Sequence, residues 1–197
     1  MTAEERIFSI VRGGLYAKLP SLALPLGRLT CREGDVDPAG TDGEAAVFAP
    51  GLLRREFLAE SDLPERLTLH LLLHLMLGHP WGRQGRARAL WDTACDLAVG
   101  LVRHALLPQE PETPAAFSAR CKLQARRAVR APAIYALLLE QPDALTAEEQ
   151  AAFYLDDHRL WQLSASASAP KTADGGAETG WQALGRKLPD PLPPKPV

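Results

Sequence analysis

Two histidines, His70 and His74, stand four positions apart in a segment that is otherwise almost entirely apolar, residues 67–77. A helix turns by about 100° per residue, so these two side chains share one helix face and are separated by one turn. Imidazole nitrogens at this spacing can converge on a single metal ion. The alternative is that both are core histidines that hydrogen bond to neighbouring carbonyl groups. In either case both rings need partners, because burying an unsatisfied polar group is costly.

The residue that follows His70 is Leu71, at the position where the HExxH metal motif carries a glutamate. That glutamate is the general base that activates a zinc-bound water in hydrolytic enzymes. Leucine cannot accept a proton, so the sequence predicts a metal site without the usual base. The nearest preceding acidic residue, Glu65, lies five positions before His70 and on the opposite helix face, which makes it a poor substitute.

Three residues are candidates for a third ligand. His79 follows Gly78, and a glycine break can turn the chain back toward the histidine helix. Asp96 lies one turn after Asp92 on the next predicted helix, and its alternative role is that of an exposed carboxylate, since charged residues are rarely buried unless paired. His158, near the end of the last predicted helix, can reach the site or orient one of its ligands.

The elements that must position these residues are mostly helical. Apolar periodicity and capping patterns predict an α+β, mainly α domain with helices at 3–11, 67–77, 89–106, 114–129, 132–139 and from Thr146 to Tyr154. We expect the pair at 13–14 to stop or kink the first helix, a capping box at 62–65 to start the histidine helix, and Gly78 to end it.

A small sheet is expected near residues 28–49. Short extended pieces at 28–31 and 45–49 can pair, and Thr41–Gly43 between them has turn chemistry, because Gly43 can adopt positive φ. Residues 1–162 are predicted to form one domain. The segment 163–197, rich first in serine, alanine and glycine and then in proline, is predicted to be a flexible tail.

The bulk properties exclude several classes of protein. The 197 residues carry a net charge of −2, so no overall field favours nucleic acid or an anionic membrane. The three cysteines include no CxxC pair, which favours a reducing compartment. The N-terminus lacks the pattern of a signal peptide, and the longest apolar run is too short to span a bilayer. We therefore expect a cytoplasmic protein.

Four segments together resemble a known family, the bacterial "putative metallopeptidase" domain, which usually precedes a von Willebrand factor A-like domain and is associated with MoxR-type AAA ATPases. The matching segments are Thr41–Gly43, His70–Pro80, Leu90–Val99 and Asp156–Trp161.

The resemblance implies a zincin-like fold, zinc as cofactor, and a MoxR-type ATPase or a von Willebrand factor A-like protein as partner. It further implies that His70 and His74 are metal ligands, that Asp96 is the matching acidic position, and that His79 falls on a family histidine. Leu71 departs from the family pattern.

Three functions compete at this stage. The first is a metal-binding pseudoenzyme, catalytically weak or inactive, that acts in recognition or scaffolding. The second is an active zinc-dependent hydrolase with a displaced base, such as Asp96 or Asp92 acting through water. The third is a metal-free helical interaction module in which His70 and His74 are core residues.

Overall fold

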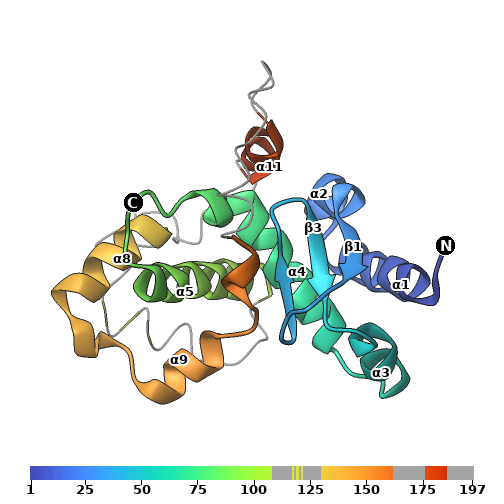
Figure 1. Ribbon diagram of the computed structural model, residues 1–197, viewed down its shortest axis with the longest axis horizontal. Coiled ribbons are helices and arrows are strands. Elements are labelled where there is room, and N and C mark those ends of the chain that lie inside the picture. The colour runs from blue at the N-terminus through green and yellow to red at the C-terminus, as the bar shows by residue number, and fades with distance from the viewer. Residues whose placement is uncertain (108–116, 118, 120, 122–129, 162–175, 186–197) are drawn as a thin grey trace, which may run out of the picture. The chain divides into compact units, whose positions relative to one another are not determined.

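A computed structural model describes residues 1–107, 117, 119, 121, 130–161 and 176–185 (Figure 1). The chain forms two compact units: the first contains Met1–Gly82 and the described residues from Leu155 onward, and the second contains the described residues between Arg83 and Tyr154. Within the described ranges, no helix has both the length and the apolar character needed to cross a membrane. The predicted helix at 114–129 lies almost entirely outside the described residues.

The first unit is organised around α4 (Leu63–Leu77), the helix that carries the two histidines. Nearly every residue from Leu67 to Met76 is buried, as expected for a helix that is apolar all round. Neighbouring elements cover it on several sides. They are α1 (Ala3–Lys18), α2 (Ala23–Arg28), α3 (Leu52–Leu58), α11 (Gly176–Gly185) and strands of the sheet.

The ends of α4 agree in part with the sequence prediction. Gly78 ends the helix in the left-handed region with φ of 73°, and its N–H donates to the carbonyl groups of His74 and Leu75, which confirms the predicted stop. The predicted capping box is wrong, since the side chain of Asp62 makes no capping hydrogen bond. A proline in the first turn, where no intrahelical donor is needed, remains favourable there.

The first helix continues past the glycine pair at 13–14, where the sequence predicted a stop or a kink. It begins with a capping box between Thr2 and Glu5 and ends only at Lys18. Val11 and Leu15, four positions apart, are both buried on the side that packs in the core. The burial of this continuous face offsets the roughly 1 kcal/mol that each helical glycine costs relative to alanine.

The sheet has three strands, β1 (Thr30–Glu33), β2 (Ala39–Thr41) and β3 (Ala45–Phe48), in the order β1-β3-β2. The predicted pairing of the segments at 28–31 and 45–49 is confirmed, since β1 and β3 pair in parallel. The turn at 42–44 instead joins β3 to β2, an antiparallel strand that the sequence did not predict. Asp42 accepts hydrogen bonds from the N–H groups of Glu44 and Ala45, and Gly43 has a φ of 97°.

The second unit contains α5 (Arg88–Leu106), α8 (Ala131–Glu140), η3 (Pro142–Ala144) and α9 (Ala147–Phe153). These bounds confirm three predicted helices. Both α8 and α9 pack against α5. Thr146 and Glu149 form the predicted capping box at the start of α9. The ring of Phe153 lies only 2.8 Å from where a side chain at Gly100 would begin, so the absence of a Cβ permits this close packing.

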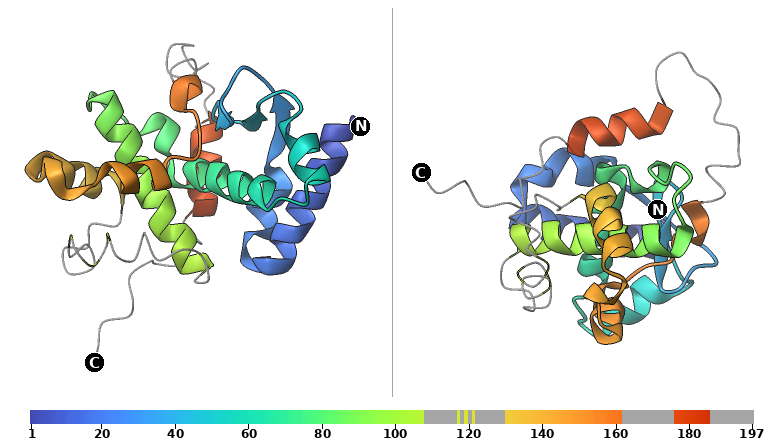
Figure 2. Two further views of the ribbon diagram at one scale, coloured as in Figure 1. Left: turned by 90° about the horizontal axis from the view of Figure 1, so that it is seen from below. Right: turned by 90° about the vertical axis from the view of Figure 1, so that its left-hand side faces the viewer.

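Helix α11 lies inside the segment for which the sequence predicted a flexible tail (Figure 2). It packs against α4, and Trp181 is buried, with the guanidinium group of Arg28 above its ring at 4.8 Å. A tryptophan supplies a large apolar surface, and this one helps to cover the apolar helix beneath. The predicted domain boundary at residue 162 stays a prediction.

Candidate metal centre

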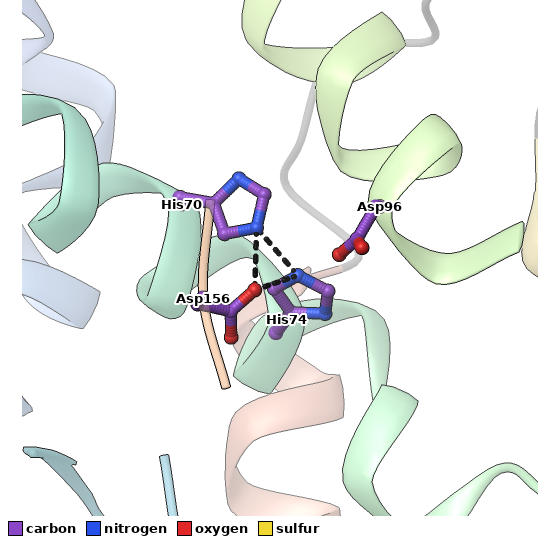
Figure 3. A group of neighbouring side chains, drawn as sticks. All are labelled: His70, His74, Asp96 and Asp156. Atoms are coloured by element: carbon purple, nitrogen blue, oxygen red, sulfur yellow. Dashed lines mark hydrogen bonds and ion pairs between the residues drawn. The ribbon is translucent and has the colours of Figure 1, made fainter. Parts of the chain in front are cut away.

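The two histidines of α4 face each other as their spacing predicts. His70 and His74 are both buried, and their Nε2 atoms lie 2.9 Å apart (Figure 3). The helix places them one turn apart, so both rings extend from the same face. The prediction that these two side chains come together is confirmed.

Asp156 joins the histidines from a segment far away in the sequence. Its Oδ1 atom lies 2.9 Å from Nε2 of His70 and 3.6 Å from Nε2 of His74, and its side chain is fully buried. Asp156 is not among the ligands predicted from the sequence. The available signal was its place in the Asp156–Trp161 segment, one of the four segments that carry the family resemblance.

Hydrogen bonding alone does not satisfy this arrangement. An imidazole Nε2 carries at most one hydrogen, yet Nε2 of His70 is 2.9 Å from both Nε2 of His74 and Oδ1 of Asp156. This nitrogen cannot donate its hydrogen to Asp156 and at the same time accept one from His74, because it has only one in-plane position for a hydrogen or a lone pair. In addition, no described residue hydrogen bonds to Oδ2 of Asp156, although that atom is buried. A buried carboxylate oxygen without a hydrogen bond indicates a missing partner.

A metal ion fits the three atoms. Tetrahedral zinc with bonds of about 2.0–2.1 Å places its nitrogen and oxygen ligands roughly 3.3–3.4 Å apart. The observed separations of 2.9, 2.9 and 3.6 Å fall around that spacing. Two imidazoles and a carboxylate are also common zinc ligands. The donor set and its geometry therefore suit zinc.

The electrostatics favour the anionic form of Asp156. Burial by itself raises the pKa of this carboxyl group, but the neighbouring imidazoles of His158, His74 and His70 outweigh it and hold the pKa well below its usual value. The carboxylate is therefore ionised at neutral pH, which is the state that binds a metal ion.

His79 contacts His74 on the other side of the ring. It lies on η2 (His79–Trp81), and its Nδ1 atom is 3.0 Å from Nδ1 of His74, whereas His70 and Asp156 face Nε2. A hydrogen bond at this position fixes the orientation and tautomer of a ligating imidazole. The contact with Nδ1 therefore places His79 on the side of His74 that faces away from His70 and Asp156, where it can orient the His74 ring.

The η2 turn that carries His79 packs against the turn between β2 and β3. The ring of Trp81 lies 3.0 Å from where a Cβ at Gly43 would begin, and Gly43 has a φ of 97°. Both the close approach and the positive φ favour glycine. The Thr41–Gly43 segment therefore supports the position of His79.

His158 contacts both the carboxylate of Asp156 and the ring of His74, whose centroid lies 5.0 Å from its own in an edge-to-face arrangement. Its Nε2 atom lies 3.0 Å from Oδ1 of Asp156, and its ring stacks on Trp161 with centroids 3.8 Å apart and planes 21° apart. His158 begins the short helix η4 (His158–Leu160). The stacking holds the imidazole of His158 beside the carboxylate. An orienting role for His158 is one of the two alternatives predicted from the sequence.

Comparison with known proteins identifies the family. The family model described as "Putative metallopeptidase domain" matches residues 13–183, which is most of the chain. The chain belongs to this family. Neither a curated protein nor a solved structure matches the sequence. The matched range includes all of the histidines and the aspartate described above.

Relative to the metallopeptidase pattern, this family member has no carboxylate directly after its first histidine. Leu71 occupies that position and is fully buried. Glu65, earlier on the same helix, forms an ion pair with Lys18. The residue that would normally serve as the base is therefore replaced by an apolar side chain within the core of the first unit.

Asp96, the acidic position that the resemblance implies, lies on α5 of the second unit and is buried. Its role as a ligand stays a prediction. His104, on the same helix, is partly exposed and belongs to none of the contacts described here.

Proposed function

We propose that this chain is a zinc-binding member of the putative metallopeptidase family that has lost its hydrolytic base and acts in recognition or scaffolding. The observation that carries the proposal is the convergence of Nε2 of His70, Nε2 of His74 and Oδ1 of Asp156 within 2.9–3.6 Å of one another in a buried site. Zinc suits this set because it binds imidazole and carboxylate ligands in small tetrahedral sites.

We further propose that Asp96 is the fourth ligand. Its match to the acidic position of the family supports this assignment, and so does its burial, since a carboxylate is rarely buried unless it is paired or ligates a metal. Zinc sites with four protein ligands are usually structural, whereas catalytic sites keep one position open for water or substrate. A bound zinc ion would here supply positive charge and directional bonds that stabilise the fold.

Three features argue against hydrolysis. Leu71 cannot accept a proton from a water molecule, and the carboxylate of Asp156 faces the histidines as a ligand rather than as a base. Asp92, considered as a displaced base, forms an ion pair with Arg88, with Nε and Oδ2 3.4 Å apart. These contacts favour the pseudoenzyme over the active hydrolase.

The metal site is tested by the metal content of the purified protein. We expect about one zinc ion per chain, the number that one tetrahedral site holds. His74→Ala should lose most of it, and the matched variant His104→Ala should keep it, because His104 lies outside the cluster. Full metal content in His74→Ala would overturn the site as described. A metal-free wild type that resists reconstitution would favour the helical interaction module.

Catalysis is tested with an unstructured protein as substrate, with and without a chelator. We expect no chelator-sensitive cleavage by the wild type, because the base is absent. Cleavage that persists through purification and disappears with chelator would favour the active hydrolase. Two reasons for inactivity are possible under this proposal: the base is missing, and four protein ligands leave no place for water on the metal. The variant Leu71→Glu separates them. If it cleaves while the wild type does not, a position on the metal is open to water and the four-ligand arrangement is wrong.

For the partner, we propose a MoxR-type AAA ATPase or a von Willebrand factor A-like protein, supported by the family resemblance of the four segments described above. The proposal is tested by measuring the binding of each purified candidate to the zinc-loaded chain and to the chelated chain. Binding that requires zinc would support a scaffolding role for the metal site, and no binding of either candidate would remove this partner proposal.

A further inference from the structure

The segment that carries Asp156 is attached to the free edge of the sheet. β2 is an outer strand in the order β1-β3-β2, and Gly40 of β2 forms a parallel bridge with Asp157. The N–H of Asp157 donates to the carbonyl oxygen of Ala39 at 2.7 Å. One residue of the segment therefore pairs with the sheet directly beside the metal ligand.

This attachment requires a glycine in β2. A Cβ built on Gly40 would lie 2.5 Å from the carbonyl oxygen of Asp157, which is closer than side-chain carbons approach backbone oxygens. Gly40 is buried beneath the segment that contains Asp157. If this segment moved away to make room for a side chain, the bridge between Gly40 and Asp157 would be lost. Any larger residue would push the segment away from the sheet.

A second contact closes the turn that follows Asp156. Asp157 accepts a hydrogen bond from the N–H of Arg159 at 2.9 Å and one from its Nε at 2.7 Å. The guanidinium group also donates to the carbonyl oxygen of Asp35 at 3.5 Å. The segment is thus held to the loop before β2 by a side chain as well as by its backbone.

The alternation of an extended chain explains how these contacts aim the ligand. Asp157 has extended backbone angles, with φ of −101° and ψ of 113°. Successive side chains in extended backbone point to opposite sides. When the side chain of Asp157 faces Arg159, the side chain of Asp156 is directed the other way, toward His70 and His74.

We infer that Gly40 and the Asp157–Arg159 pair are positioning residues for the metal centre, because they hold the 155–159 segment on β2 so that Oδ1 of Asp156 meets the two histidines. The inference rests on the proposed zinc site. Partners that orient a metal ligand typically change metal affinity by about 10- to 100-fold when they are removed.

The test is the zinc affinity of the full chain, measured by competition with a chromophoric chelator. Gly40→Ala is compared with Gly27→Ala, a substitution on α2 where nothing lies within 4 Å of the added carbon. Arg159→Gln is compared with Arg55→Gln, which breaks an exposed ion pair with Glu56. We expect zinc affinity to fall about 10- to 100-fold in the first member of each pair and to stay unchanged in its control.

Cobalt-loaded protein supplies a readout that does not depend on activity. Its visible absorption bands report the ligand geometry, and we expect them to shift in Gly40→Ala and Arg159→Gln but not in the controls. If Gly40→Ala fails to fold, the milder Arg159→Gln decides. Wild-type affinity and spectrum in the folded test variants would overturn the positioning role and leave the zinc site standing. A wild-type chain that binds no zinc would overturn both.

Discussion

Removing the metal should destabilise the protein strongly, because the metal-free cluster leaves Oδ2 of Asp156 buried without a hydrogen bond to any described residue. Nε2 of His70 lies 2.9 Å from both His74 and Asp156 and has at most one hydrogen to share. In the metal-free state this nitrogen therefore cannot hydrogen bond well to both partners at once. A buried group with no hydrogen bond, such as Oδ2 of Asp156, costs about 1–3 kcal/mol.

The size of the effect follows from linkage between binding and folding. A ligand that binds only the folded state at a free concentration about 1,000 times its Kd stabilises that state by about 4 kcal/mol. This binding free energy of about 4 kcal/mol already includes the free energy gained when the metal satisfies the buried polar atom, so the two values are not added. For a chain of about 150–250 residues, each kcal/mol shifts the unfolding midpoint by about 2–4 °C, so chelation should lower it by about 8–16 °C.

The assay is differential scanning calorimetry of zinc-loaded and chelated protein at one concentration. Tryptophan fluorescence follows the same transition, since Trp161 stacks on His158 beside the site. His104→Ala should show the full difference between loaded and chelated protein. His74→Ala should show almost none, because the second Nε2 ligand is gone. An unchanged wild-type midpoint after chelation, with the metal shown to be removed, would refute the reasoning.

Three further predictions concern the first unit. Burial raises the pKa of Asp42, but two backbone N–H donors and a neighbouring guanidinium outweigh it and hold that pKa below its usual value. Asp42→Ala should therefore cost about 1 kcal/mol at neutral pH, and the difference from wild type in urea unfolding should shrink as the pH falls through the lowered pKa. Burial and nearby carboxylates raise the pKa of Cys31 to about 11. Its alkylation at pH 8, followed by mass spectrometry, should therefore be about 100-fold slower in the folded protein than in urea. Equal rates would contradict the raised pKa. Gly78→Ala should lower the free energy of unfolding by about 1–2 kcal/mol because Gly78 has a positive φ. Gly13→Ala in the middle of α1, where a Cβ has room, should raise that free energy by about 0.5–1 kcal/mol. If denaturant unfolding shows both variants shifted in the same direction, the left-handed helix end is refuted.

Local sequence was sufficient for the histidine pair and for the helix that carries it. The period of the α-helix alone places His70 and His74 on one face, and the left-handed preference of Gly78 ends the helix soon afterwards. The same local rules located α5, α8 and α9 in the second unit, including the capping box at Thr146. Each of these features depends on interactions among residues only a few positions apart.

The sequence was less informative where packing outweighs local preference. α1 continues through two glycines because Val11 and Leu15 keep one buried face, and the apolar surface of α4 is covered in part by a helix from the predicted tail through Trp181. β2 is only three residues long and is defined by its pairing with β3. Burial against other elements, which has no local signature, decided these cases.

The position of Asp156 beside the two histidines is the clearest product of the tertiary structure. Asp156 stands 86 positions after His70, and its carboxylate reaches the histidines because Gly40 admits the segment to the edge of β2. No periodic pattern connects residues so far apart. The spacing of His70 and His74 predicted a metal site, and Leu71 at the position of the usual glutamate predicted a site without its base. Folding decided which carboxylate of this unit completes it, because only long-range packing brings a charged oxygen into a buried position between two imidazoles.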